Sequence, residues 1–186
     1  MTTDTLGHDA LMWRRLQSVD EGFYVELYTD RQTMRQIGPA MDQRTAADSF
    51  ACALALSAPA RVRRLVLCEI SGQAIALAGI EPVSGEPGWS EFGIFLRATA
   101  RGRHLSRAGL GALIAASFVC QGQVGALARI APENTAAVRL HASLTFVTAP
   151  SQTSNALQVL RLTKARWQQS AHTPRGPINV ADDCFA

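Results

Sequence analysis

The chain has 186 residues and a mass of 20.0 kDa, which is enough for one domain with a substantial hydrophobic core. Hydrophobic residues make up 47% and charged residues 18%, a composition that excludes a disordered chain. Lys and Arg together number 18 against 15 for Asp and Glu. The net charge of +3 is too small to indicate a nucleic-acid partner.

The sequence also bears on location and redox chemistry. No segment approaches the roughly 18 consecutive apolar residues of a membrane span, and residues 1–10 lack the basic start and apolar stretch of a secretory signal. Cys52, Cys68, Cys120 and Cys184 are far apart and form no C-x-x-C pair. We therefore expect a cytoplasmic protein with four free thiols, no metal site and no membrane partner.

The first half of the chain alternates β-rich and helical segments. A strand is expected at 12–16 and a helix at 21–29, where Phe23 and Leu27 have helical spacing. After the break at Ile37-Gly38-Pro39, Asp42 or Thr45 starts an alanine-rich helix that ends before Pro59. Three strands follow, with a turn at 71–73 and a loop at 81–88, and they span residues 64–70, 74–80 and 89–96.

The second half begins with the most regular helical pattern in the chain, at 105–120. A strand is expected at 124–130, a helix at 134–144, and two closing strands at 146–149 and 156–167. From Gln168 onward the chain is polar, and we expect a loosely ordered tail. This order predicts a single mixed α/β domain over residues 1–186, with its core at about 12–167.

The segment from Glu91 to Phe118 is the most informative for function. It reads as a strand, a loop rich in arginine and small residues, and a long helix. Because a helix N-terminus exposes unpaired N–H groups and the positive end of its dipole, such a loop is suited to bind phosphate. The loop has neither a Walker pattern nor G-x-G-x-x-G, which argues against a nucleoside triphosphate or a Rossmann dinucleotide.

This segment resembles motif A of the GCN5-related N-acetyltransferase (GNAT) superfamily. The resemblance rests on Phe92-Gly93-Ile94-Phe95-Leu96, Arg101-Gly102-Arg103-His104-Leu105-Ser106 and Ala108-Gly109-Leu110. Three further segments resemble, in the same order, the branch that acetylates ribosomal proteins. They are Thr29-Asp30 with Met34 and Ile37-Gly38-Pro39; Pro132-Glu133-Asn134-Thr135-Ala136 with Arg139-Leu140 and Leu144-Thr145-Phe146; and Leu160-Arg161-Leu162-Thr163-Lys164 with Trp167.

The resemblance implies a fold and a co-substrate. The fold would be a single GNAT-like α/β (α+β) domain, with a central mixed, mostly antiparallel sheet of about six to seven strands flanked by about four helices. The co-substrate would be acetyl-CoA, with no metal. Three residues depart from the family pattern: His104 and Thr145 stand at glycine positions, and Ala137 stands at a serine position.

Cofactor-binding residues follow from the resemblance and from the charge of the loop. The backbone near Ile94 or Phe95 would donate to the acetyl oxygen, and the Asn134 side chain would bond the pantetheine arm. Arginines around the helix start favour phosphate contact. The full set is Ile94, Phe95, Leu96, Arg101, Gly102, Arg103, His104, Leu105, Ser106, Arg107 and Asn134.

Two residues are candidates for catalysis. Glu91 starts the fourth expected strand, where a family carboxylate often serves as general base; the alternative is a solvent-facing glutamate. His141 lies seven residues after Asn134, where the family often has a tyrosine that acts as the general acid; the alternative is a structural histidine. Glu69, Glu81 and Ser143 are lesser candidates, and Trp89 is the one aromatic candidate for substrate contact.

The predicted function is an acyl-CoA-dependent N-acyltransferase that transfers an acetyl group to a primary amine. No cysteine stands in a clear nucleophile position, so we expect direct attack by the amine rather than an acyl-enzyme. The acceptor would be a protein N-terminus or a small molecule, and the protein a monomer or a homodimer. The alternative is a non-catalytic acyl-CoA sensor or protein-interaction module with the same fold.

Overall fold

The computed structural model describes residues 11–56, 64–102, 104–149, 157–170 and 179–181. Six α-helices and eight strands lie in this part of the chain, with short 3-10 turns at Ser18–Asp20 and Ala98–Ala100. In chain order they are β1 (Met12–Arg15), α1 (Glu21–Thr29), α2 (Arg31–Met34), α3 (Gln43–Leu56), β2 (Arg64–Ile70), β3 (Gln73–Pro82), β4 (Trp89–Leu96), α4 (Leu105–Cys120), β5 (Gly125–Ile130), α5 (Thr135–Ser143), β6 (Val147–Thr148), β7 (Gln158–Thr163), α6 (Lys164–Gln169) and β8 (Asn179–Val180).

The strands form one sheet in the order β6-β7-β5-β4-β3-β2-β1-β8. Strands β1 to β4 pair antiparallel in sequence, as do β5 with β7 and β6 with β7. The two parallel contacts are β1 with β8 and β4 with β5. The predicted α/β domain with a mixed, mostly antiparallel sheet is confirmed.

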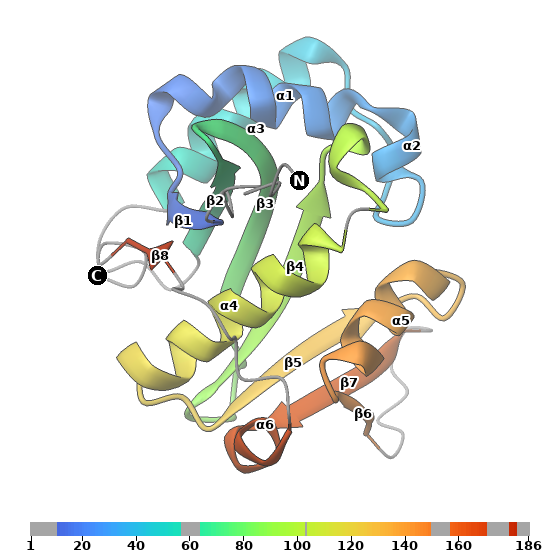
Figure 1. The fold of residues 1–186 in the computed structure, drawn as a ribbon. Helices are drawn as coiled ribbons and strands as arrows, with labels where there is room; N and C mark the ends of the chain where they lie inside the picture. The colour runs from blue at the N-terminus through green and yellow to red at the C-terminus, as the bar shows by residue number, and fades with distance from the viewer. Residues whose placement is uncertain (1–10, 57–63, 103, 150–156, 171–178, 182–186) are drawn as a thin grey trace, which may run out of the picture.

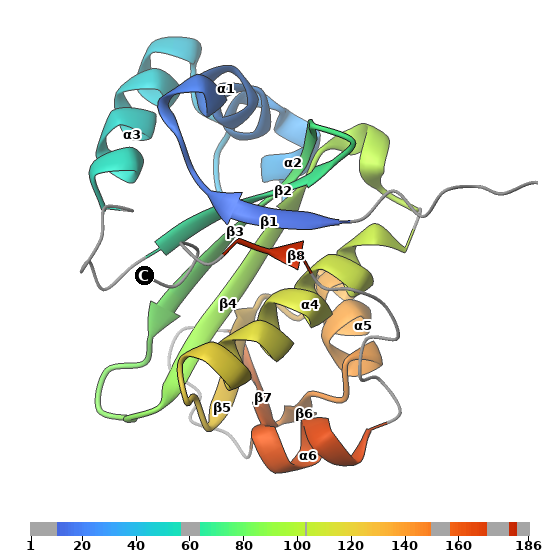
Figure 2. The same ribbon diagram turned by 60° about the vertical axis from the view of Figure 1, so that its left-hand side comes forward.

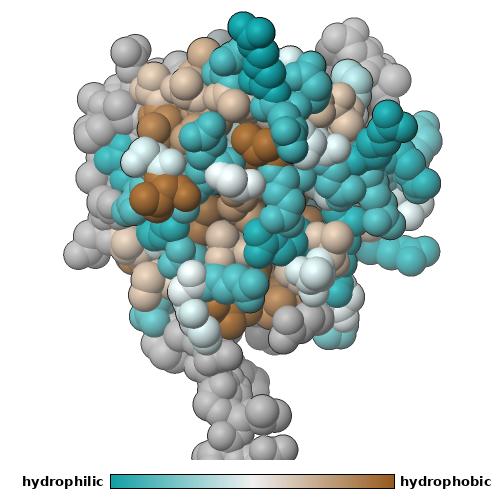
Figure 3. Space-filling view, turned by 90° about the horizontal axis from the view of Figure 1, so that it is seen from above, coloured by the Kyte–Doolittle hydropathy of each residue, from teal (hydrophilic) through white to brown (hydrophobic). Residues whose placement is uncertain are grey.

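Helices cover both faces of this sheet (Figures 1 and 2). On one face α1 and α3 pack through Phe23, Leu27 and Phe50 onto Leu67 and Leu77. On the other face α4 and α5 pack onto a larger apolar cluster, whose strand residues include Val66, Ala78, Ile80, Phe92 and Ala128. Seen from above, over the α1 and α3 side, hydrophobic residues lie in small groups among hydrophilic ones (Figure 3).

Helix α4 is fixed to the sheet by a buried hydrogen bond. The indole Nε1 of Trp13, on β1, donates to the carbonyl of Gly109 over 2.8 Å, and Trp13 is fully buried. A Cβ on Gly109 would lie 3.3 Å from the Trp13 ring, so glycine lets the helix come this close. The bond therefore holds the helix that follows the predicted phosphate loop in one position on the sheet.

Three expectations from the sequence need correction. The expected strand at 156–167 is wrong beyond Thr163, because the Thr163 side chain accepts a hydrogen bond from the Arg166 N–H and caps α6. The short helix α2 and the strand β8 add to the expected elements. Of the expected loose tail, residues 179–180 are part of the sheet as β8, beside β1.

Thr145, at a family glycine position, follows the end of α5 with φ of 67°. Its N–H donates to the Ala142 carbonyl over 2.9 Å, and the next N–H, of Phe146, donates to the His141 carbonyl over 3.1 Å. This pair of hydrogen bonds around a residue in the left-handed conformation is a Schellman motif, and glycine is the preferred residue at that position. The His141 and Phe146 rings, whose centroids lie 4.9 Å apart, supply the usual accompanying apolar contact.

Thr145→Gly should therefore raise the free energy of unfolding by about 1 kcal/mol, or about 2–4 °C in Tm. A β-branched residue is strained at this φ, and the Thr145 hydroxyl is buried without a hydrogen-bond partner in the described structure. Thermal and urea denaturation measure the change. Thr145→Ala serves as the control, because it removes the hydroxyl but keeps the strained Cβ; a gain as large with alanine as with glycine would disprove the backbone explanation.

Candidate active site

The hydrogen-bonded pairing of β4 with β5 is short, and the stretch beyond it, where the two strands are no longer paired, is called the opening. These parallel strands pair only at Trp89–Glu91 with Gly125–Leu127 and then diverge (Figure 1). On its other edge β4 stays paired with β3 as far as Leu96. The stretch of β4 from Phe92 to Leu96 therefore has one backbone edge that β5 does not cover, and these N–H and C=O groups can bond a ligand placed in the opening.

The N-terminus of α4 lies beyond the end of β4. Its N-cap, His104, makes no side-chain capping bond, and the first turn carries no acidic residue. Gly102 has φ of 72° with no atom within 4 Å of an added Cβ, so the loop leaves space around it. A 16-residue helix with an uncapped N-terminus next to an open glycine fits the pyrophosphate of acetyl-CoA.

His104 adopts the geometry of the glycine whose place it takes. Its φ is 59°, in the left-handed region, and its side chain is exposed. His104→Gly should keep or tighten acetyl-CoA binding, because glycine reaches this conformation without the roughly 1–2 kcal/mol penalty. Calorimetric titration of both proteins with acetyl-CoA measures this. A loss of affinity beyond tenfold would show instead that the imidazole itself contacts the ligand.

Two of the three arginines predicted to bind phosphate lie in the described part of the chain. The Arg101 guanidinium points toward the start of α2, where it donates to the Thr33 hydroxyl and lies 3.9 Å from the Asp30 carboxylate. It thereby ties the phosphate loop to α2. Arg103 lies outside the described residues, and Arg107 lies exposed in the first turn of α4.

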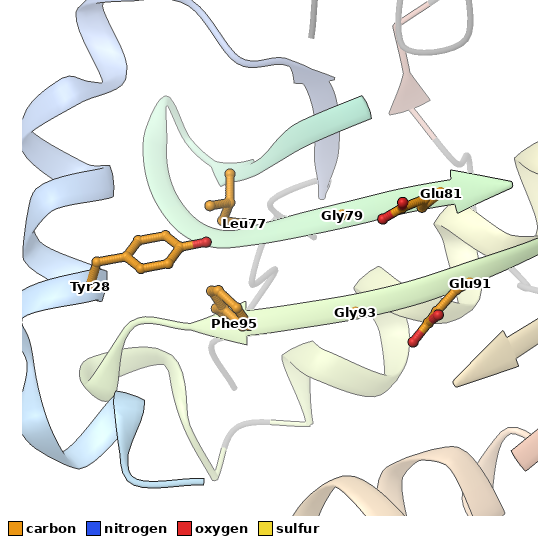
Figure 4. Close-up of a pocket in the computed structure, with 7 residues that line it drawn as sticks. All are labelled: Tyr28, Leu77, Gly79, Glu81, Glu91, Gly93 and Phe95. Atoms are coloured by element: carbon orange, nitrogen blue, oxygen red, sulfur yellow. The ribbon is translucent and has the colours of Figure 1, made fainter. Parts of the chain in front are cut away.

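A second feature lies on the α1 face of β3 and β4, as a pocket of about 150 Å³ (Figure 4). Its seven lining residues come from α1, β3 and β4: Tyr28, Leu77, Gly79, Glu81, Glu91, Gly93 and Phe95. The pocket shares with the opening the same stretch of β4. A ligand in the pocket and a ligand in the opening would therefore meet at this strand.

Glu91, the predicted base, is one of the residues that line this pocket. Its carboxylate accepts a hydrogen bond from the guanidinium of Arg129, on β5. The backbone of Glu91 is at the last position where β4 pairs with β5, so Arg129 reaches across the beginning of the opening. Glu81, a lesser candidate, lies directly opposite Glu91 on β3 and lines the same pocket, whereas Glu69 pairs with Arg14.

His141 and Asn134 both lie on α5, away from the pocket lining. The Asn134 carboxamide oxygen caps the helix by accepting from the Ala137 N–H over 3.1 Å. The His141 side chain is buried, with Nδ1 2.8 Å from the Ala137 carbonyl and Nε2 without a partner in the described structure. Burial lowers the pKa of His141, and the contact with the Ala137 carbonyl offsets this only in part.

Trp89, the aromatic candidate for substrate contact, lies outside the pocket lining. The Arg161 guanidinium lies over the Trp89 ring, 4.0 Å from the ring centroid, and the ring packs on Gly125. In the parts of the chain that the structure describes, no three His, Cys, Asp or Glu side chains are placed to hold a metal ion. No described helix is both long and apolar enough to span a membrane.

The sequence analysis missed Tyr28, Leu77, Gly79 and Arg129. Folding the two expected strands about the loop at 81–88 would set Gly79 opposite Ser90, whereas the observed register is shifted by three residues and sets it opposite Gly93, because β3 extends to Pro82. Tyr28 comes from a helix more than 40 residues away in sequence, and its pattern marks it only as part of an apolar helix face. No local sequence pattern predicts that the Tyr28 side chain lines one end of the pocket.

The short parallel pairing of β4 with β5, the α4 N-terminus beyond β4 and the pocket on the same strand lie close together in the fold. Residues 10–147 match the family described as the acetyltransferase (GNAT) domain. The chain belongs to this family, and the predicted N-acetyltransferase class and acetyl-CoA co-substrate are confirmed at that level.

Solved structures agree with this fold. The spermidine N-acetyltransferase from Vibrio cholerae, in complex with CoA and spermine, superposes with a TM-score of 0.69 and 18% identity, covering 85% of this chain and 98% of that chain. The aminoglycoside acetyltransferase AAC(6')-Ib, in complex with coenzyme A, superposes with a TM-score of 0.73 and 14% identity, covering 87% and 99%. No curated protein sequence matches the chain.

Proposed function

We propose that this protein transfers the acetyl group of acetyl-CoA directly to a small primary amine. The observation that carries the proposal is the position of the pocket on the stretch of β4 that borders the opening. The α4 N-terminus and Gly102 would hold the pyrophosphate, and the uncovered edge of β4 would bond the thioester end. The pocket would hold the amine.

The reaction needs one base and one donor for the carbonyl oxygen. The amine nitrogen bonds to the acetyl carbon, the C–S bond breaks, and the Glu91 carboxylate accepts the amine proton directly or through water. Backbone N–H near Ile94 or Phe95 stabilises the developing oxyanion. Counted from the protonated acceptor R–NH3+, the nitrogen loses two protons, one before attack and one as the amide forms. The thiolate leaves and takes up one proton, so that the products are an amide, coenzyme A and one released proton.

The proposal leaves the protonation of the thiolate to solvent rather than to His141. The Ala137 carbonyl can only accept, so Nδ1 of His141 carries the proton of the neutral ring and Nε2 has none to donate. Burial lowers the pKa of this ring and disfavours the charged form that could act as an acid.

The structural neighbours support a small acceptor. The Vibrio cholerae enzyme was solved with spermine and AAC(6')-Ib with ribostamycin, and both ligands carry amines. The pocket volume of about 150 Å³ also favours a small molecule over a folded protein surface. The branch that acetylates ribosomal proteins remains a prediction from sequence.

The test is an amine panel in an assay for released thiol, preceded by calorimetric titration with acetyl-CoA. We expect acetyl-CoA to bind and at least one small primary amine to release coenzyme A in proportion to acetylated product. If acetyl-CoA binds but none of the small amines or N-terminal peptides leads to release of coenzyme A, the acyl-CoA sensor is favoured. Absence of binding would favour the interaction module.

A further inference from the structure

We propose, on the basis of the proposed function, that the acceptor is a primary amine with a single cationic end and an apolar body. The ammonium would lie beside Gly93, within reach of the Glu81 and Glu91 carboxylates directly or through water, and the apolar body would lie against Leu77, Phe95 and Tyr28. This differs from polyamines and aminoglycosides, which carry several cationic groups.

The register of β3 and β4 arranges the pocket in three successive levels. Glu81 pairs with Glu91, Gly79 with Gly93, and Leu77 with Phe95, and alternation along a strand puts all six on one face. Because a strand rises about 3.3 Å per residue, the charged level lies roughly 13 Å from the apolar level. The pocket therefore has two carboxylates at one end and mainly apolar side chains at the other, where the Tyr28 hydroxyl points toward the strands (Figure 4).

The charged level suits an ammonium group. Carboxylates directly opposite each other on neighbouring strands repel, and a cation between them relieves the repulsion. In this structure the Arg129 guanidinium contacts Glu91 from the β5 side. An ammonium that enters from the pocket side meets Glu91 and Glu81 together, next to the opening where the thioester would lie.

The apolar level is fixed and carries no charge. Leu77 is buried in the core beneath α1 and α3. The ring of Tyr28 contacts Phe95 edge-on with centroids 5.5 Å apart, and it stacks on Tyr24 at 4.3 Å. No carboxylate lines the pocket at this level, and the nearest α1 carboxylate upstream, Glu26, is paired with Arg97. A second ammonium would find no carboxylate here, only the Tyr28 hydroxyl and the faces of the aromatic rings, whereas a phenyl or alkyl group would fit.

Gly93 leaves the middle level open. No atom lies within 4 Å of a Cβ built on it, and its φ is not in the left-handed region, so a side chain there would stand in the pocket without colliding with the protein. Substitution at this residue can therefore reduce the space for the acceptor without disturbing the fold. This provides a test that does not depend on removing a charged or core residue.

The first measurement is calorimetric binding of 2-phenylethylamine, hexylamine, putrescine, spermidine and ribostamycin in the presence of coenzyme A. We expect 2-phenylethylamine or hexylamine to bind at least about tenfold more tightly than the three polycationic amines. Equal or tighter binding of putrescine, spermidine or ribostamycin would overturn the inference. Because this measurement needs no turnover, a failure of the proposed function would show separately, as absent coenzyme A release with an amine that binds.

The second measurement compares Gly93→Val with wild type. We expect 2-phenylethylamine binding to weaken at least about tenfold, while the affinity for coenzyme A, which lacks the acetyl group, stays within about twofold and Tm within about 2 °C. Gly22→Ala, on α1 and also with no atom near the added Cβ, is the control; it should leave both affinities unchanged and keep or slightly raise Tm. Unchanged amine binding in Gly93→Val would place the acceptor elsewhere and overturn the inference.

Discussion

Glu91→Gln is expected to reduce turnover by about two orders of magnitude while leaving acetyl-CoA affinity nearly unchanged. Glutamine keeps the size of the side chain at the pocket but cannot accept the amine proton. The proposed pyrophosphate site at the α4 N-terminus involves other residues, so the cofactor should bind as before. Turnover is measured as steady-state thiol release with the best amine of the panel, and acetyl-CoA affinity is measured by calorimetry.

The control for Glu91 is Arg129→Gln. It removes the ion pair on Glu91 but keeps the carboxylate, and an exposed pair of this kind contributes only about 0–1 kcal/mol to stability. We expect a loss of turnover below about tenfold. The remaining activity of Glu91→Gln should rise with pH, because more of the amine is then already deprotonated. Near wild-type turnover of Glu91→Gln across the pH range would assign the base to another group.

Elements set by local patterns could be predicted from the sequence. The apolar period of 105–120 gives α4 with its observed bounds, and the turn at Ser71–Gln73 gives the β2–β3 pair. The glycine positions of the family pattern also proved informative. His104 and Thr145 stand there in this chain, and both adopt the left-handed backbone for which the family uses glycine.

Features that depend on contacts between distant segments could not be predicted. Lys164–Gln169 reads as an extension of an apolar strand, but the Thr163 cap turns it into a helix. The composition of the phosphate loop suggests that Arg101 faces a ligand, whereas Asp30 and Thr33 draw its side chain toward α2. In both cases side-chain hydrogen bonds, one at Thr163 and more than one at Arg101, compete with the local preference.

The same limit applies to the site. Glu91 could be placed at a strand start beside an expected cleft, but its partner Arg129 comes from a strand that reaches it only through the short parallel pairing of β4 with β5. The pocket exists because α1 covers the Leu77 and Phe95 level of the sheet and leaves the glycine level open. Such coverage is a property of packing and leaves no mark in either strand alone.

Ser106→Asp should have opposite effects on stability and on cofactor binding. The first turn of α4 carries no acidic residue, so a carboxylate there interacts favourably with the positive end of the helix dipole. We expect the free energy of unfolding to rise by about 0.3–1 kcal/mol. The same charge would face the pyrophosphate of acetyl-CoA at the N–H groups that bind it. We therefore expect affinity to fall at least about 30-fold, which is about 2 kcal/mol.

The control is Val119→Glu, which adds the same charge at an exposed position near the opposite end of α4. At 1.5 Å per residue it lies about 20 Å from Ser106, beyond a Debye length at physiological salt, so acetyl-CoA affinity should not change. Adding salt should recover part of the affinity lost in Ser106→Asp, because screening weakens the repulsion. If Ser106→Asp is stabilised but binds acetyl-CoA as tightly as wild type, the pyrophosphate does not lie at the α4 N-terminus, and the cofactor must reach the β4–β5 opening from another side.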